Sequence, residues 1–108
     1  MASDNALAEL LTLNCRIGQF GETIYTNSEG QLHRVHGPAV AYPNGSEFWL
    51  QYGQRHRTDG PASIYADGLR RWFLNHMEYT QAEWLKLVKD WPHVVMQVYV
   101  GNPSPSSD

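Results

Sequence analysis

Short apolar runs separated by turn residues follow one another through the middle of the chain. Residues 39–42 are apolar, Asn44-Gly45 comes next, and residues 47–52 are rich in aromatic side chains. Asn-Gly between two such runs is a strong short-range signal for a β-hairpin with a type I′ turn, in which both central residues have positive φ. The pattern therefore predicts a β-hairpin in this part of the chain.

The hairpin pattern occurs twice in the sequence. Residues 33–50 and 56–73 align at an offset of 23 residues, and eight of the 18 aligned positions are identical. These positions are His33/His56, Arg34/Arg57, Gly37/Gly60, Pro38/Pro61, Ala39/Ala62, Tyr42/Tyr65, Gly45/Gly68 and Trp49/Trp72. A single hairpin is marginal in water, so repeated copies stack side by side and bury a common face. We expect an antiparallel meander of hairpins with Trp49 and Trp72 in its core.

A capping box, Thr80-Gln-Ala-Glu83, predicts the start of a helix over 81–90, because its hydroxyl and carboxylate satisfy free backbone donors at the helix start. Pro92 ends this helix, and the valine-rich residues 93–100 predict a final strand. One helical face should pack on the sheet through Trp84, Leu85, Val88 and Trp91.

The fold class expected is mainly β, an antiparallel meander of repeated β-hairpins capped by a short N-terminal helix and by a C-terminal helix plus strand. Leu7, Leu10 and Leu11 have helical spacing and should cover the first hairpin. The chain is one domain long. We expect that domain over 1–100, with an N-terminal cap at 1–21, hairpin repeats at 22–79, a helix and strand at 80–100, and a disordered tail at 101–108.

The composition favours an aromatic core and excludes a strong long-range electrostatic role. Leu, Ile, Val and Phe supply only 23 of 108 residues, whereas the chain has four Trp and six Tyr. The net charge of −3 gives no whole-chain footprint for nucleic acid or an anionic membrane. Cys15 is the single cysteine, which excludes an internal disulfide. Without a signal-peptide pattern or a membrane-spanning run, we expect a cytoplasmic protein.

The repeated unit His-Arg-x-(Asp/His)-Gly-Pro-Ala-x-x-Tyr-x-x-Gly-x-x-x-Trp resembles the Gly-Pro-Ala variant of the MORN-type β-hairpin repeat, which occurs in tandem in phage and large-virus proteins. The resemblance covers about residues 22–90. It implies a scaffold or binding surface rather than a shared active site. The sequence departs from the pattern at His36, where Asp is preferred, and at His76, where Gly is preferred, and the second departure predicts a strained or altered final turn.

No arrangement in the sequence supports catalysis. It has no carboxylate pair with spacing for general acid and base chemistry, no phosphate-binding glycine loop and no Ser/His/Asp set. A lone cysteine such as Cys15 is most often a small buried hydrophobe. We therefore expect a non-enzymatic protein without a cofactor or metal. From the resemblance, the leading hypothesis is a phage-encoded inhibitor that occludes a host defence complex such as CRISPR–Cas in the host cytoplasm.

Aromatic, basic and acidic side chains form the candidate surface for a host protein or nucleoprotein complex. Phe48, Tyr52 and Arg55 are of the types that dominate binding hot spots, and acidic residues would dock on a basic channel. The candidate partner-binding set is Glu22, Glu29, Glu47, Phe48, Tyr52, Arg55, Asp67 and Arg71.

Three alternatives stay open. One is a structural module that self-assembles, for example as a homodimer through exposed strand edges. The second is a weak binder of nucleic acid or lipid headgroups through Arg55, Arg57, Arg70 and Arg71. The third concerns a metal site at His33, His36, His56 and Asp59. Against the metal site, a His-Arg pair repeated before each Gly-Pro is better suited to hydrogen-bonding the backbone of the turns between units.

Overall fold

The computed structural model describes residues 4–89 and consists of nine short strands between two helices. The elements are α1 (Asp4–Thr12), β1 (Asn14–Ile17), β2 (Thr23–Thr26), β3 (Val40–Ala41), β4 (Glu47–Phe48), β5 (Leu50–Gln51), β6 (Gln54–Arg55), β7 (Ser63–Ile64), β8 (Arg70–Leu74), β9 (Met77–Tyr79) and α2 (Gln81–Lys89). Neither described helix is long and apolar enough to cross a bilayer.

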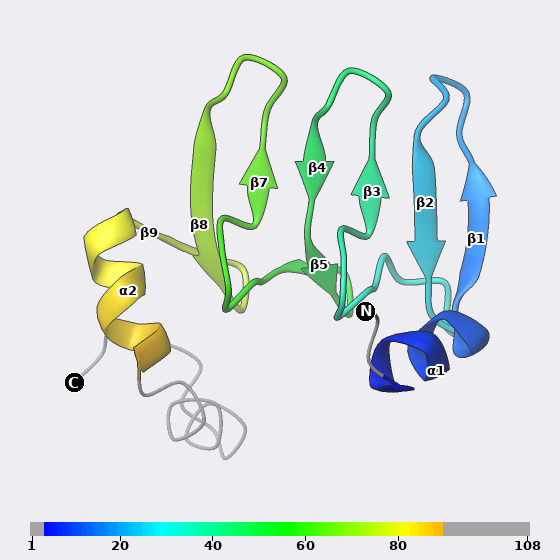
Figure 1. Cartoon of the computed structure of the whole chain (residues 1–108), viewed down its shortest axis with the longest axis horizontal. Coiled ribbons are helices and arrows are strands. Elements are labelled where there is room, and N and C mark those ends of the chain that lie inside the picture. Colours follow the sequence, from blue (N-terminus) through cyan, green and yellow to red (C-terminus); the bar gives the residue numbers. More distant parts are fainter. Residues whose placement is uncertain (1–3, 90–108) are drawn as a thin grey trace.

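Seven of the strands form one antiparallel sheet in the order β1-β2-β3-β4-β7-β8-β9, and β5 and β6 form a small separate ribbon. Figure 1 shows the three hairpins β1-β2, β3-β4 and β7-β8 standing side by side, with both helices at their lower ends. This arrangement confirms the predicted fold class. Because each hairpin pairs with the next, the backbone groups of the inner strands are satisfied within the sheet.

The hairpin turns differ from the predicted type I′ geometry. Gly45 has φ of +98°, but Asn44 is not among the residues with positive φ. The Gly45 amide donates to the Tyr42 carbonyl, and the Asn44 side chain accepts from the Ser46 amide at 2.9 Å. This is a three-residue loop in which only the last residue needs a left-handed conformation. Asn serves here as a side-chain acceptor, so the type I′ prediction was wrong at this turn.

Turns with two residues of positive φ occur instead between the repeat units. Tyr52 and Gly53 have φ of 53° and 78°, and Asn75 and His76 have φ of 49° and 73°. Positive φ strains residues other than glycine, and histidine at 76 carries that strain where the repeat pattern has glycine. The final turn has nearly the same φ angles as the Tyr52-Gly53 turn, so the prediction from His76 is confirmed for the strain and was wrong for an altered turn.

The hairpin array begins earlier than predicted, at Asn14. The prediction placed residues 1–21 in a cap, but β1 pairs with β2 from Asn14 opposite Thr26 to Ile17 opposite Thr23. The signal for this third copy in the sequence is weak, since residues 21–25 align with residues 45–49 at an offset of 24 and share only the glycine Gly21/Gly45 and the aromatic pair Tyr25/Trp49. A longer loop after β2 hides the match when an offset of 23 is used.

The helix α2 begins as predicted. Thr80 Oγ1 accepts from the Glu83 amide at 3.2 Å, and Glu83 accepts from the Thr80 amide at 3.0 Å. Trp84 is 5% exposed against the end of the sheet, but Leu85 is 50% exposed, so its predicted packing was wrong. Trp91, the strand over 93–100 and the tail over 101–108 lie outside the described residues.

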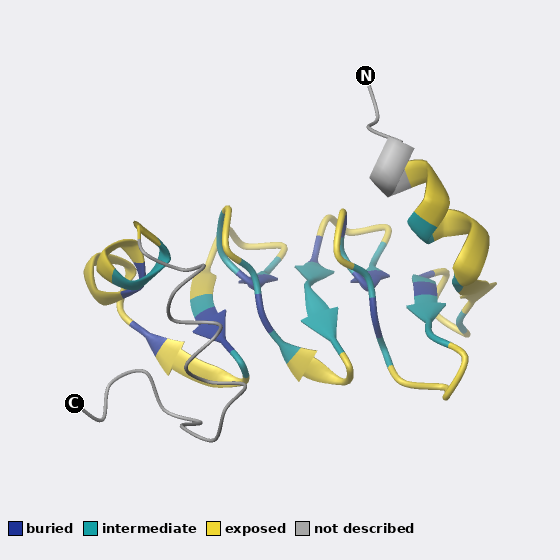
Figure 2. Cartoon of the chain, turned by 90° about the horizontal axis from the view of Figure 1, so that it is seen from below, coloured by how far each residue is buried: buried dark blue, intermediate teal, exposed yellow. Residues whose placement is uncertain are grey.

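The N-terminal helix does not cover the first hairpin with its leucines. Leu7, Leu10 and Leu11 are 53%, 40% and 87% exposed, and Figure 2 shows α1 as mostly exposed. Glu9 attaches the helix instead, since its carboxylate accepts from the amides of Val35 and His36 at 2.5 and 3.0 Å. Helical spacing identified the element but not the face that it uses.

Candidate functional site

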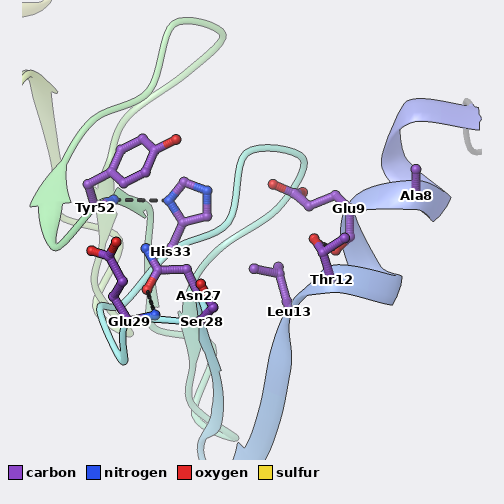
Figure 3. Close-up of a pocket in the computed structure, with 9 residues that line it drawn as sticks. All are labelled: Ala8, Glu9, Thr12, Leu13, Asn27, Ser28, Glu29, His33 and Tyr52. Carbon is purple, nitrogen blue, oxygen red and sulfur yellow. Dashed lines mark hydrogen bonds between the residues drawn. The ribbon is translucent and has the colours of Figure 1, made fainter.

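The repeated histidines hold the turns between units. His33 Nδ1 accepts from the Tyr52 amide, and His56 Nδ1 accepts from the Asn75 amide, both at 3.0 Å and both across 19 residues. Both side chains are buried. Figure 3 shows the His33 bond as a dashed line, with the Tyr52 ring beside the imidazole. The prediction that the repeated histidine hydrogen-bonds turn backbone is confirmed.

The repeated arginines each cover an aromatic ring of the preceding unit. The guanidinium carbon of Arg34 lies 4.3 Å from the Tyr25 ring centre, and that of Arg57 lies 3.6 Å from the Trp49 ring centre. Such cation–π contacts are worth from about 0.5–1 kcal/mol at exposed sites to about 2 kcal/mol when desolvated. Trp49 was predicted in the core, but it is half-buried and Arg57 covers it. The arginines therefore join one unit to the next.

The repeated Gly-Pro segment makes room for these arginines. A Cβ on Gly37 or Gly60 would lie only 2.6 or 2.7 Å from the guanidinium carbon of Arg34 or Arg57. The guanidinium of Arg57 also donates to the Pro61 carbonyl at 3.1 Å. A Cβ at either position would displace the guanidinium, so glycine is favoured here by close approach and not by its φ angle. The Gly-Pro-Ala motif is therefore a structural feature.

Residues of the candidate metal site take part in the contacts that hold the repeat units together. Asp59 accepts from Arg57 Nε at 2.7 Å, and His36 is exposed. Within residues 4–89, no group of three His, Cys, Asp or Glu side chains has an arrangement that could hold a metal ion. The geometry supports a structural role for His33 and His56 over a ligand role.

Burial changes the acid–base chemistry of His56. Desolvation lowers the pKa of His56 from 6.5 to about 4. The neutral ring is the form that accepts from Asn75 at Nδ1, so the hydrogen bond places its proton on Nε2. A histidine held neutral in a turn contributes to stability near pH 7 and is poorly suited to carry protons for a reaction.

The two faces of the sheet follow from the strand register. Val40 pairs with Phe48, Phe48 with Ser63, and Ser63 with Arg71. Paired residues of antiparallel strands share a face, so this row defines one side, which we call the Phe48 face. Neighbouring residues point the other way, which places Glu47 and Arg70 on the opposite face. Arg70 and Arg71 are therefore on different sides of the sheet.

An aromatic strip crosses the Phe48 face. The Phe48 ring meets the Tyr42 ring at 6.0 Å and the Tyr65 ring at 5.5 Å, both edge to face. All three side chains are half-buried. Beside the strip lies a groove of about 270 Å³, lined by Leu32, Val40, Tyr42, Phe48, Leu50 and Arg55. Arg55 stacks over the Phe73 ring at 5.3 Å, which fixes its position at the edge of the groove.

Phe48 and Arg55 are thus brought together as predicted, whereas Tyr52 lies elsewhere. Its ring centre is 4.4 Å from that of His33, in a hollow between α1 and the loop after β2 (Figure 3). Glu29 lines the same hollow. Phe48 and Arg55 of the predicted set therefore lie at the groove on the Phe48 face, and Tyr52 and Glu29 lie in the hollow beside α1.

The acidic residues of the predicted set do not form one surface. Glu22 is 8% exposed, and its carboxylate accepts from the Phe20 amide at 2.9 Å in the first hairpin turn. Asp67 accepts from the Leu69 amide in the third hairpin turn. Glu47 is on the face opposite Phe48, and Glu29 is beside α1. This scatter removes the basis for docking through a shared acidic patch.

The four arginines proposed for nucleic acid are also dispersed. Arg57 is held over Trp49 and paired with Asp59, and its side chain is only 17% exposed. Arg55 stacks on Phe73, and Arg70 and Arg71 lie on opposite faces. Together they give no continuous basic surface of the kind that tracks a phosphate backbone.

Searches of protein-family models, curated proteins and solved structures find no match to this chain.

Proposed function

We propose that this protein is a non-catalytic binding module that holds a protein partner on the Phe48 face. The observation that supports this most directly is the half-buried strip of Tyr42, Phe48 and Tyr65 beside an apolar groove. Aromatic residues that are packed on one side and open on the other lose little side-chain freedom when a partner covers them. Such residues are typical binding anchors.

The groove suits a side chain of a protein better than a small molecule. Its volume of about 270 Å³ lies below the range of about 300–1,000 Å³ that is usual for small-molecule pockets. Arg55 borders it, and Arg71 is in the row that contains Phe48. A partner segment with an apolar anchor and a nearby carboxylate would complement this combination. We therefore propose a partner with an acidic and apolar patch, the reverse of the basic channel expected from the sequence.

The resemblance to phage repeat proteins supports a more specific proposal, that the partner is a host defence complex blocked by occlusion. Expression of the protein in bacteria that carry an active CRISPR–Cas system should raise the number of plaques formed by a targeted phage. The Phe48→Arg variant should fail to do so. Equal plaque counts with and without the wild-type protein in each defence system tested would contradict the inhibitor role and leave the binding face to be tested separately.

Affinity capture with three matched baits tests the binding face. The repeat supplies matched variants, because each substitution installs a residue that the next unit has at the equivalent position. Phe48→Arg installs the equivalent of Arg71, and Glu47→Arg installs the equivalent of Arg70 on the opposite face. A bacterial lysate is passed over wild-type, Phe48→Arg and Glu47→Arg protein, and the retained proteins are quantified by mass spectrometry.

The proposal predicts a protein that the wild type and Glu47→Arg retain and Phe48→Arg loses by tenfold or more. A tenfold loss corresponds to about 1.4 kcal/mol, which is modest for an aromatic anchor. Loss with Glu47→Arg alone would assign binding to the opposite face. Equal capture by all three baits would exclude both faces.

A further inference from the structure

The two ends of the sheet are finished differently. At the β9 end, α2 packs on β8 and β9, and its Trp84 indole donates to the Arg57 carbonyl at 2.9 Å. At the other end, all four residues of β1 are exposed. Within residues 4–89, no strand pairs with the outer edge of β1. Figure 1 shows β1 as the last strand on that side, with α1 below it.

The hydrogen-bond pattern shows which backbone groups face outward. Gly18 donates to the Glu22 carbonyl at 2.8 Å, and this bond fixes the alternation along the hairpin. With the register of β1 on β2, Asn14 and Arg16 then bond to β2, and the backbone groups of Cys15 and Ile17 point to the free edge. The edge therefore offers two N–H and two C=O groups, two residues apart.

Two large apolar side chains beside this edge are exposed. Ile17 is 65% exposed and Phe20 is 67% exposed. Natural edge strands are usually blunted by several charges, a proline or a bulge. Here Arg16 is the single charge in β1, and the strand pairs regularly with β2.

We propose that the outer edge of β1 pairs with β1 of a second copy of this chain, in an antiparallel two-fold dimer. The contact already exists twice within the chain, because adjoining hairpins meet through antiparallel strands at β2-β3 and at β4-β7. A second copy turned by a two-fold axis repeats that geometry, and the outward N–H and C=O of Ile17 in one copy match those of Ile17 in the other. The two sheets would then join into one.

The charge of Arg16 selects the register. Pairing Cys15 with Ile17 of the second copy would place the two Arg16 side chains directly opposite each other, which is destabilising. Centring the pairing on Ile17 avoids this contact, brings the two exposed isoleucines together and places each Arg16 opposite Gly18. In this register the Cα atoms of the two Cys15 residues lie about 14 Å apart, from four residue steps along the strand and one strand spacing.

Proline at position 17 tests the edge directly. The Ile17 N–H faces outward, so Ile17→Pro removes a donor of the proposed contact and leaves the β1-β2 hydrogen bonds in place. Sedimentation velocity should show a concentration-dependent dimer for the wild type and for the control Ile17→Thr. Each copy of the dimer loses one N–H donor, so two hydrogen bonds are lost across the contact. Ile17→Pro should therefore raise the dimer dissociation constant about tenfold or more. Circular dichroism checks that the variant is folded.

A spin label gives a second readout that does not depend on proline. Cys15 is the only cysteine and is exposed, so one nitroxide attaches at a known place. The proposed dimer predicts dipolar coupling between labels at a distance below about 30 Å, and loss of that coupling when unlabelled protein is added in excess. A monomer at every concentration up to millimolar would overturn the proposal. So would a dimer in which the labels show no coupling and Ile17→Pro has no effect.

Discussion

The two aligned copies, residues 33–50 and 56–73, share one set of structural contacts, which we call the frame, and differ in the residues around it. In each copy a buried histidine accepts from a turn amide, and an arginine covers a ring of the preceding unit. The copies differ at His36 and Asp59. Asp59 binds Arg57 Nε, whereas Arg34 Nε is buried with no hydrogen-bond partner among the described residues. The first copy therefore keeps the frame but lacks one of its supports.

The copies also differ on their surfaces. Phe48 and Glu47 of the first copy correspond to Arg71 and Arg70 of the second, one on each face of the sheet. The residues that both copies share hold the array together, and the residues that differ set the chemistry of the two faces.

The largest effect is expected where the array ends. In place of another arginine, Trp84 of α2 meets Trp72 at a ring distance of 6.5 Å, and it is 5% exposed. Trp84→Ala should lower the free energy of unfolding by about 3–5 kcal/mol, because it leaves a cavity and removes a hydrogen bond to Arg57. Urea unfolding followed by fluorescence measures this. Leu85→Ala, at a half-exposed neighbour, should cost less than about 1 kcal/mol.

The next largest effect is a dependence on pH. The pKa of folded His56 is about 4 and its ordinary value is 6.5, so the unfolded chain binds more protons between these values. The contribution of neutral His56 to the free energy of unfolding is therefore complete above pH 6.5. It is lost as the pH drops toward 4, which lowers the free energy of unfolding by about 3 kcal/mol.

The His56→Asn variant separates this effect from that of other titrating groups. Asparagine offers an acceptor near the position of Nδ1 and does not titrate, so the fall in unfolding free energy between pH 6.5 and 4 should be smaller in this variant. Parallel pH profiles for the two proteins would show that His56 is not the source.

Removing the arginines should affect the two copies unequally. Both variants lose a ring contact and a guanidinium bond to a proline carbonyl, and Arg57→Met loses the bond to Asp59 as well. Arg57→Met should therefore cost about 2 kcal/mol and Arg34→Met about 1 kcal/mol. Chemical denaturation of both variants gives the difference. Equal losses would show that Asp59 contributes nothing.

The smallest effect is a gain. His36→Asp gives the first copy the acid that Asp59 provides in the second, within reach of the buried Arg34 Nε. The free energy of unfolding should rise by about 1 kcal/mol, as for a charge-assisted hydrogen bond. The same substitution in the Arg34→Met background should give no gain, since its partner is absent. A gain of the same size there would mean that the acid acts elsewhere.

The repeat made most of the fold predictable. Identical residues at a fixed offset predicted the hairpins, the turns between units and the role of the histidines, because each unit must satisfy the same backbone groups. The first hairpin was missed because the loop after β2 changes the offset from 23 to 24. The exposed leucines of α1 were misplaced because spacing gives a helix its apolar face but not a surface for it to cover.

The candidate site was only partly predictable. Phe48 and Arg55 were correctly expected on one surface, since both line the groove on the Phe48 face. The prediction that the acidic residues form one surface was wrong, because the fold places them far apart. Two of them, Glu22 and Asp67, accept hydrogen bonds within hairpin turns. The low exposure of the Arg57 side chain could not be predicted, because a charged residue is normally expected at the surface. The resemblance to phage repeats, and the inhibitor role that it suggests, stay predictions.

The most direct test of the central claim is one double variant, Glu47→Arg/Phe48→Arg, which gives the first copy the strand residues of the second. If shared residues hold the frame and differing residues bind, the variant stays folded, with an unfolding free energy lowered by no more than about 2 kcal/mol, and it loses the partner captured by the wild type. An unfolded variant would show that the differing residues are part of the frame. A folded variant that still captures the partner would show that the Phe48 face does not bind it.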